Sequence, residues 1–260
     1  MTRRRGIAWL SVAALLLAGA LSLRWLLQPE HLAPAILDLA GDALGLEIRA
    51  EGVGEYRLRG TPQLVVRQLT AREPGATRPL LLAERVLISV PWSTLRARGR
   101  ERIAERIELD APVLDMAALQ SWLARRPPSD APLPTLTRGI GIADGQVLGA
   151  GWKIDGLHAQ VQSLSPGQPL RMHLRGRYAG DGISAPLDLH ATLTRPASGA
   201  GVGVSGLLAL ETAAWRLPAR LTLSAKLQSG TGLVLQHAVL GANARYESGE
   251  RQLPFALGLA

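Results

Sequence analysis

The sequence lacks cysteine and contains few aromatic residues. Its 260 residues include no Cys, one Phe, three Tyr and six Trp. Without cysteine the chain can form neither a disulfide nor a thiolate metal site, so its fold depends on burial and backbone pairing. Because the apolar residues are mainly Leu, Ala and Val, we expect any core or apolar surface to be aliphatic.

Lysine is also scarce, occurring only at Lys153 and Lys226, so arginine supplies nearly all of the 29 positive charges. Four of the eight net positive charges lie in residues 1–28, which leaves a net charge of +4 for the rest. The remaining positive residues are interleaved with 21 acids, whereas a nucleic-acid interface needs a concentrated basic face with stacking aromatics. We therefore expect no nucleic-acid partner.

Residues 6–23, GIAWLSVAALLLAGALSL, carry no charge. Eighteen residues at about 1.5 Å each give about 27 Å of helix, close to the thickness of a bilayer's hydrocarbon core. The arginines at positions 3–5 favour the cytoplasmic side for the N-terminus. Residues 1–28 are thus predicted to form a cytoplasmic tip and a single transmembrane helix in a bacterial inner membrane, with the bulk of the chain in the periplasm.

A cleaved signal peptide is the alternative for the same segment. Ala18-Gly19-Ala20 resembles a signal-peptidase site after an apolar stretch. Both interpretations predict export of the remaining chain.

Two short helices are expected in the exported part. Residues 30–44 repeat apolar side chains at helical spacing, and Gly45 follows as a stop signal. Residues 116–126 follow Asp115, which can cap their first turn. The apolar face of this second helix consists of Met116, Leu119, Trp122 and Leu123.

Most of the chain after residue 46 alternates apolar and polar residues, which is typical of β-strands with one buried face. Turn signals separate these runs: Pro74-Gly75, Asp144-Gly145, Pro166-Gly167, Gly180-Asp181-Gly182, Ser198-Gly199 and Ser229-Gly230. Among them, Asp144-Gly145 in particular suits a tight hairpin. The pattern predicts a mainly β fold with a curved, mostly antiparallel sheet.

Residues 127–134, PPSDAPLP, contain four prolines and are expected to be irregular. We place the main boundary there. The predicted organisation is an anchor over 1–28, a helix and strand region over 29–126, a proline-rich linker over 127–137 and a β region over 138–260.

No catalytic chemistry is evident in the sequence. The five histidines show no metal-binding spacing, so we expect surface strand residues and no metal site. Residues 201–206 match G-x-G-x-x-G, but the apolar stretch after them reads as a strand rather than a helix, and a flexible hairpin is expected. We predict no catalytic residue, no cofactor and no enzymatic activity.

The stretch LRMHLRGRY, residues 170–178, raises the question of what its apolar face contacts. Leu170, Met172 and Leu174 alternate with Arg171 and Arg175, which we place on the solvent side. One possibility is ordinary packing on another sheet, helix or partner. The other is an open groove for apolar cargo, because soluble proteins avoid large uncovered apolar patches. The candidate groove residues are Leu170, Met172, Leu174, Leu187, Leu189, Leu221 and Leu223.

Several stretches resemble the AsmA-like family, which includes TamB-type proteins of the bacterial envelope. They are PEHLAPAILDLAGDALGLEIRAEG at 29–52, GTPQLVVRQLTAREP at 60–74, LLLAERVLISVPWSTLRARG at 80–99 and RIELDAPVLDM at 106–116. The resemblance implies an inner-membrane anchor, a chorein-like N-terminal region over 29–126 and a β-groove. It also implies a role in moving or organising phospholipids and in outer-membrane assembly.

The expected function is therefore binding and handing on of lipid acyl chains. A groove of about 200 residues is short for crossing a periplasm, so we expect an envelope protein partner or a homo-oligomer. The alternative is a non-catalytic structural module or a type II secretion accessory protein similar to the N component, whose apolar face is filled by its own core or a partner.

Overall fold

The computed structural model describes residues 37–260 except 39, 43, 58–59, 98–102, 126–133, 196–198 and 230–232. The apolar run 6–23 and the expected anchor lie outside the described residues. Within the described part, no helix combines the length and the apolar character that crossing a membrane requires.

Strands make up most of the described chain. They are β1 (Glu47–Arg57), β2 (Gln63–Arg72), β3 (Leu81–Ser89), β4 (Ile103–Ala104), β5 (Arg106–Asp110), β6 (Val113–Asp115), β7 (Thr135–Leu136), β8 (Ile140–Leu148), β9 (Trp152–Val161), β10 (Leu170–Gly180), β11 (Ile183–Leu193), β12 (Ala200–Glu211), β13 (Arg216–Ser229), β14 (Leu233–Ser248) and β15 (Arg251–Leu259). Helical residues occur within 37–44, in α3 (Trp92–Arg96) and in α4 (Met116–Arg125).

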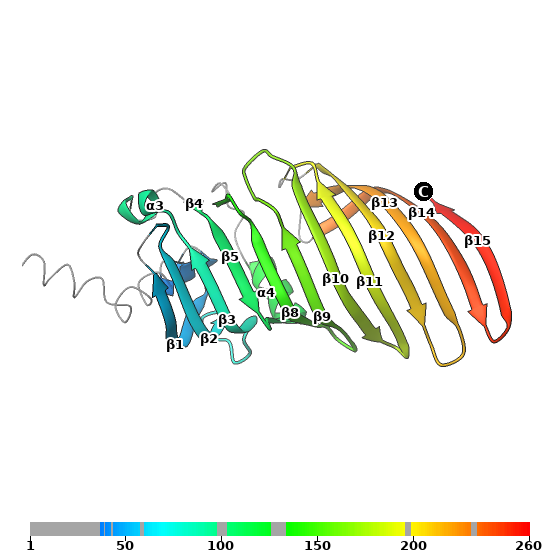
Figure 1. Ribbon diagram of the computed structural model, residues 1–260, viewed down its shortest axis with the longest axis horizontal. Coiled ribbons are helices and arrows are strands. Elements are labelled where there is room, and N and C mark those ends of the chain that lie inside the picture. The colour runs from blue at the N-terminus through cyan, green and yellow to red at the C-terminus, as the bar shows by residue number, and fades with distance from the viewer. Residues whose placement is uncertain are drawn as a thin grey trace, which may run out of the picture.

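One sheet of 13 strands runs the length of the described chain. Its order is β1-β2-β3-β5-β8-β9-β10-β11-β12-β13-β14-β15, with β6 paired to both β3 and β8. Figure 1 shows these strands side by side along the long axis. The pairs β5–β8 and β6–β8 are parallel, and the other pairs in this sheet are antiparallel. The predictions of a mainly β fold and a mostly antiparallel sheet are confirmed.

The predicted linker at 127–137 does not interrupt this sheet, because β5 precedes it and pairs with β8, which follows it. Regular structure resumes directly after residues 127–134, which were expected to be irregular and lie outside the described residues up to 133. Thr135 and Leu136 form β7, which pairs with β4, and Leu136 is only 2% exposed. Burial of this leucine helps to fix the end of the connection.

The capping prediction for the second helix is confirmed. The Ala118 backbone N–H donates to Asp115 Oδ1 at 2.9 Å, which satisfies one of the free amides of the first turn of α4. Leu119 and Trp122 pack against the hydrophobic core, whereas Leu123, expected on the same face, is 47% exposed.

The expected stop at Gly45 is also confirmed. Gly45 has a positive φ of 63°, and the Leu46 amide donates to the Gly41 carbonyl at 2.9 Å, so the helix ends in a glycine C-cap. Leu37 and Leu46, on either side of this turn, are both in the core. The helix end thereby anchors the start of β1.

The turns at Pro74-Gly75 and Pro166-Gly167 fall between strands, as predicted. The tight two-residue hairpin occurs at Asp181-Gly182, where Gly180 pairs with Ile183. Both turn residues have positive φ, 51° and 74°, which is the conformation of a type I′ turn. This turn fixes the register of β10 and β11.

Two turn predictions are wrong. Asp144-Gly145 lies inside β8, where Asp144 has a φ of 52° and the register with β9 shifts, so the pair forms a β-bulge and not a hairpin. The glycine-rich residues 201–206 lie inside β12 and pair with strands on both sides. Glycine and aspartate favour bulges as well as turns, because both accept positive φ.

Gly206 marks a close approach between β11 and β12. A Cβ on Gly206 would lie 2.1 Å from the Asp188 carbonyl oxygen, whereas one on Gly203 in the same strand would meet nothing within 4 Å. We expect Gly206→Ala to lower the free energy of unfolding by about 2 kcal/mol or more, and Gly203→Ala to change it by about 0.5 kcal/mol or less. Urea unfolding followed by circular dichroism measures both. Equal effects would contradict the close approach.

Candidate functional site

The sheet has one continuous apolar face. Residues opposite one another on neighbouring strands share a face, so the register shows which side chains lie in a row across the sheet. The first row crosses eleven strands and consists of Leu64, Ile88, Ile107, Ile140, Val161, Met172, Ala191, Val204, Leu223, Leu240 and Leu259. It contains no polar residue.

A second row runs beside the first. It consists of Val66, Val86, Leu109, Ile142, Ala159, Leu174, Leu189, Gly206, Leu221, Ala242 and Leu257. Ten steps of about 4.8 Å make each row about 48 Å long. We call the side of the sheet that carries both rows the apolar face, and the opposite side the polar face.

The seven predicted groove residues fall on the apolar face. Met172 and Leu223 lie in the first row, and Leu174, Leu189 and Leu221 lie in the second, with Gly206 between the last two. The others lie just outside the two rows, where Leu170 pairs with Leu193 and Leu187 pairs with Leu208. The register thus brings together side chains from β10, β11 and β13.

Helices cover only the N-terminal part of this face among the described residues. Leu37 belongs to the buried core cluster that also contains Val66 and Val86 of the rows, and the α4 residues Leu119 and Trp122 pack against this cluster. In Figure 1, α4 lies behind the sheet near β8, and the ends of β13 and β14 turn toward that same side. From β10 onward no described helix lies on the apolar face.

Large hydrophobic side chains are buried in the N-terminal part of the sheet and become more exposed toward its C-terminal end. The N-terminal core buries large side chains such as Leu64 and Val66, whereas the buried hydrophobic residues described after Val147 are all alanines: Ala185, Ala200, Ala209 and Ala225. In β13, Leu221 and Leu223 are half-buried and alternate with exposed residues. In β15, Leu257 and Leu259 are 45% and 55% exposed. The C-terminal half therefore has an apolar face without a core of its own.

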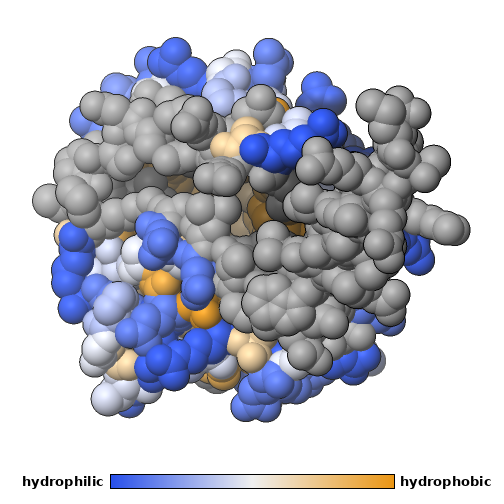
Figure 2. Space-filling model, turned by 90° about the vertical axis from the view of Figure 1, so that its left-hand side faces the viewer, coloured by the Kyte–Doolittle hydropathy of each residue, from blue (hydrophilic) through white to orange (hydrophobic). Residues whose placement is uncertain are grey.

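Figure 2 looks along the sheet from its β1 end. Most described residues at the outline of this view are hydrophilic, and small patches of described hydrophobic residues show nearer its centre.

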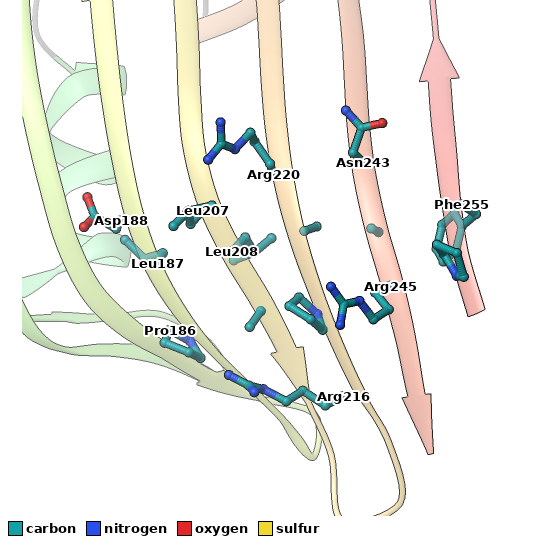
Figure 3. A pocket seen from close by; sticks show the side chains of 15 residues that line it. Pro186, Leu187, Asp188, Leu207, Leu208, Arg216, Arg220, Asn243, Arg245 and Phe255 are labelled. Carbon is teal, nitrogen blue, oxygen red and sulfur yellow. The ribbon is translucent and has the colours of Figure 1, made fainter. Parts of the chain in front are cut away.

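The polar face carries a depression of about 750 Å³ over β11 to β15. Its floor includes Pro186, Ala209 and Pro218, which lie in one row of the polar face. Figure 3 shows the side chains of Arg216, Arg220 and Arg245 extending from β13 and β14 toward β12. This depression lies on the opposite side of the sheet from the apolar rows, so the apolar face is an open surface and not a closed cavity.

The polar face also brings two histidines together. His173 of β10 and His190 of β11 are directly opposite, and their rings stack with centroids 4.2 Å apart and planes 7° from parallel. His173 Nε2–H donates to Asp188 Oδ1 at 2.6 Å, and Arg175 Nε donates to Asp188 Oδ2 at 2.9 Å. Ligand atoms of His173, Asp188 and His190 lie within 4.8 Å of one another.

The sequence alone predicts each of these histidines only as a surface strand residue. The signal that could have connected them is the Asp181-Gly182 turn, because a two-residue hairpin loop places His173 opposite His190 by counting outward from the turn. The sequence favours Asp144-Gly145 for the tight hairpin instead.

The surroundings of Asp188 lower the pKa of its carboxyl below the ordinary value of 3.8. The main cause is the hydrogen bond from His173, and the positive charge and hydrogen bond of Arg175 act in the same direction, while desolvation opposes them. Asp188 therefore remains a carboxylate at neutral pH.

Comparison of the chain with protein-family models, with curated proteins and with solved structures finds no match.

Replacing His173 by Ala should raise the pKa of Asp188 toward 3.8, because it removes the main hydrogen bond to the carboxylate. In the native chain, the stabilising effect of Asp188 is present above its unfolded pKa and is lost as pH falls through its lower folded pKa. Carboxyl ¹³C NMR titration in the presence of a chelator measures the change. His158→Ala is the control, since His158 contacts Asp144 and not Asp188. An unchanged Asp188 pKa in the His173 variant would contradict this account.

Proposed function

We propose that this protein binds lipid acyl chains along the uncovered part of its apolar face and hands them on. The proposal includes the inner-membrane anchor at residues 1–28, a periplasmic location for the sheet and a contribution to envelope assembly. The resemblance to the AsmA-like family suggests the same role. The observation that carries the proposal is the pair of apolar rows that continue past the helices that cover their first part.

The dimensions of the uncovered face suit an acyl chain. From β10 to β15 each row makes five steps of about 4.8 Å, or about 24 Å. One acyl chain spans about 15 Å, half of the hydrocarbon thickness of a bilayer. Burying a methylene group contributes about 0.8 kcal/mol, so a chain lying along the rows gains enough to remain bound outside a membrane.

The chemistry of the face also suits an acyl chain. Between β10 and β15 the two rows contain only Leu, Ala, Val, Met and Gly, which offer no side-chain hydrogen bond. An acyl chain needs none, whereas a polypeptide partner would place its backbone amides and carbonyls against a surface that cannot satisfy them. The small residues Ala191, Gly206 and Ala242 leave space between the leucines.

Photo-crosslinking in native membranes tests where lipid lies. A photoreactive residue at Leu174 or Leu221 should give lipid adducts, because both side chains point to the apolar face. The neighbouring positions Arg175 and Thr222, on the polar face, serve as controls. Mass analysis of the adducts identifies the crosslinked molecule. Protein adducts alone at Leu174 and Leu221 would instead favour a structural or secretion-accessory module whose partner covers the face.

A charge on the apolar face should block the bound chain. Leu221→Asp places a carboxylate in the second row, and we expect it to lower the yield of lipid adducts at position 174 at least tenfold, because the carboxylate resists desolvation. Thr222→Asp adds the same charge on the polar face and should leave the yield unchanged. Limited proteolysis confirms that both variants are folded. Equal yields in the two variants would refute acyl binding along the rows.

A further inference from the structure

We propose that His173, Asp188 and His190 form a binding site for a divalent transition-metal ion, of which Zn²⁺ is the representative. The site lies on the polar face of β10 and β11, opposite the apolar rows. It does not depend on the proposed acyl binding. The sequence spacing of the three residues matches no metal-binding motif.

The backbone fixes the three ligands. His173 and His190 are paired residues of a hairpin whose two-residue turn allows no slippage, and Asp188 is two residues from His190 on the same face. Paired residues on antiparallel strands have Cβ atoms about 5 Å apart, a separation that two imidazoles can bridge through one ion. The scaffold is a rigid central part of the sheet, since β9 and β12 flank this hairpin.

The distances fit one ion after small side-chain rotations. Nitrogen and oxygen atoms that bind Zn²⁺ at about 2.0–2.2 Å lie at most about 4.4 Å from each other. The three ligand atoms here already lie within 4.8 Å. The imidazole planes are nearly parallel, so one ring must rotate about its Cβ–Cγ bond to direct its nitrogen at the ion. His190 is exposed and free to do so.

The carboxylate of Asp188 is also oriented for a metal. Arg175 holds Asp188 Oδ2 and leaves Oδ1 to face the histidines. Arg175 thus orients the carboxylate as an outer-sphere partner, at the cost of a nearby positive charge.

Two imidazoles and one carboxylate select the class of ion. Imidazole favours Zn²⁺, Cu²⁺ and Ni²⁺, whereas Mg²⁺ and Ca²⁺ prefer sites made of oxygen. Three protein ligands leave at least one coordination position for water or for an external ligand. The site is therefore open, and it faces solvent.

Titration of the full chain in detergent micelles with Zn²⁺ tests the proposal. We expect one equivalent of Zn²⁺ to bind with a dissociation constant in the micromolar range or below, and Mg²⁺ not to compete. His173→Ala and His190→Ala should each weaken Zn²⁺ binding at least tenfold. X-ray absorption at the zinc edge should show imidazole ligands in the native chain, a signal that a merely structural role of these residues would not produce.

His158→Ala is the matched control, because His158 also lies on the polar face beside a carboxylate, Asp144, at 3.2 Å, but has no second histidine. It should leave Zn²⁺ affinity unchanged. If the three histidine variants weaken binding equally, the ion binds nonspecifically and the proposal is wrong. If His190→Ala retains native affinity, the stacked pair is not the site. Because His190 is exposed, loss of folding is not expected to obscure the result.

Discussion

The structure depends on keeping the apolar side chains of the two rows on the same face of a long sheet. A shift of one residue in any strand would move its apolar set to the opposite side. The two rows across eleven strands show that the register is maintained from β2 to β15, through both antiparallel and parallel pairs. The continuous apolar face and the hairpin pairing of His173 with His190 both follow from this constraint.

Strict alternation of apolar and polar residues in the sequence would not have kept the apolar side chains on one face. Four buried residues of β2 belong to the core cluster, Leu64 and Val66 before Gln68 and Leu69 and Ala71 after it, whereas buried Val65 does not. The parity of the core residues changes at Gln68, whose φ is 51°. Bulges in β8 and in the pair β13–β14 have the same effect. Residues with positive φ therefore return the apolar side chains to one face as the strands twist.

These bulges explain what could and could not be read from the sequence. The mainly β character, the cap at Asp115 and the stop at Gly45 depend on local chemistry, and each was predictable. Asp144-Gly145 was wrongly predicted to form a hairpin, because positive φ occurs in a bulge inside a strand as well as in a hairpin turn. The parallel pairing of β5 with β8 was not predictable, since a proline-rich connection carries no signal of which strands it joins.

For the candidate sites, too, the sequence predicted the features that depend on local pattern and missed those that depend on how distant segments pack. Alternation of Leu170, Met172 and Leu174 with arginines was enough to place them on one face. It could not show whether another layer covers that face, because covering depends on where α4 packs. Likewise, the histidine cluster depends on cross-strand register, which a search for short sequence motifs does not consider.

The two halves of the sheet differ in what holds them together. The N-terminal half packs leucines and valines under two helices, with Leu64 and Val66 almost fully buried. In the C-terminal half, the described hydrophobic residues that are buried are alanines, and solvent-exposed ion pairs such as Arg175–Asp188 contribute little to stability. Backbone hydrogen bonds between neighbouring strands are the main stabilising interaction in this half. Its leucines remain partly exposed to water. Covering them with apolar material would lower the free energy further, which is why we expect the face to be occupied in its working state.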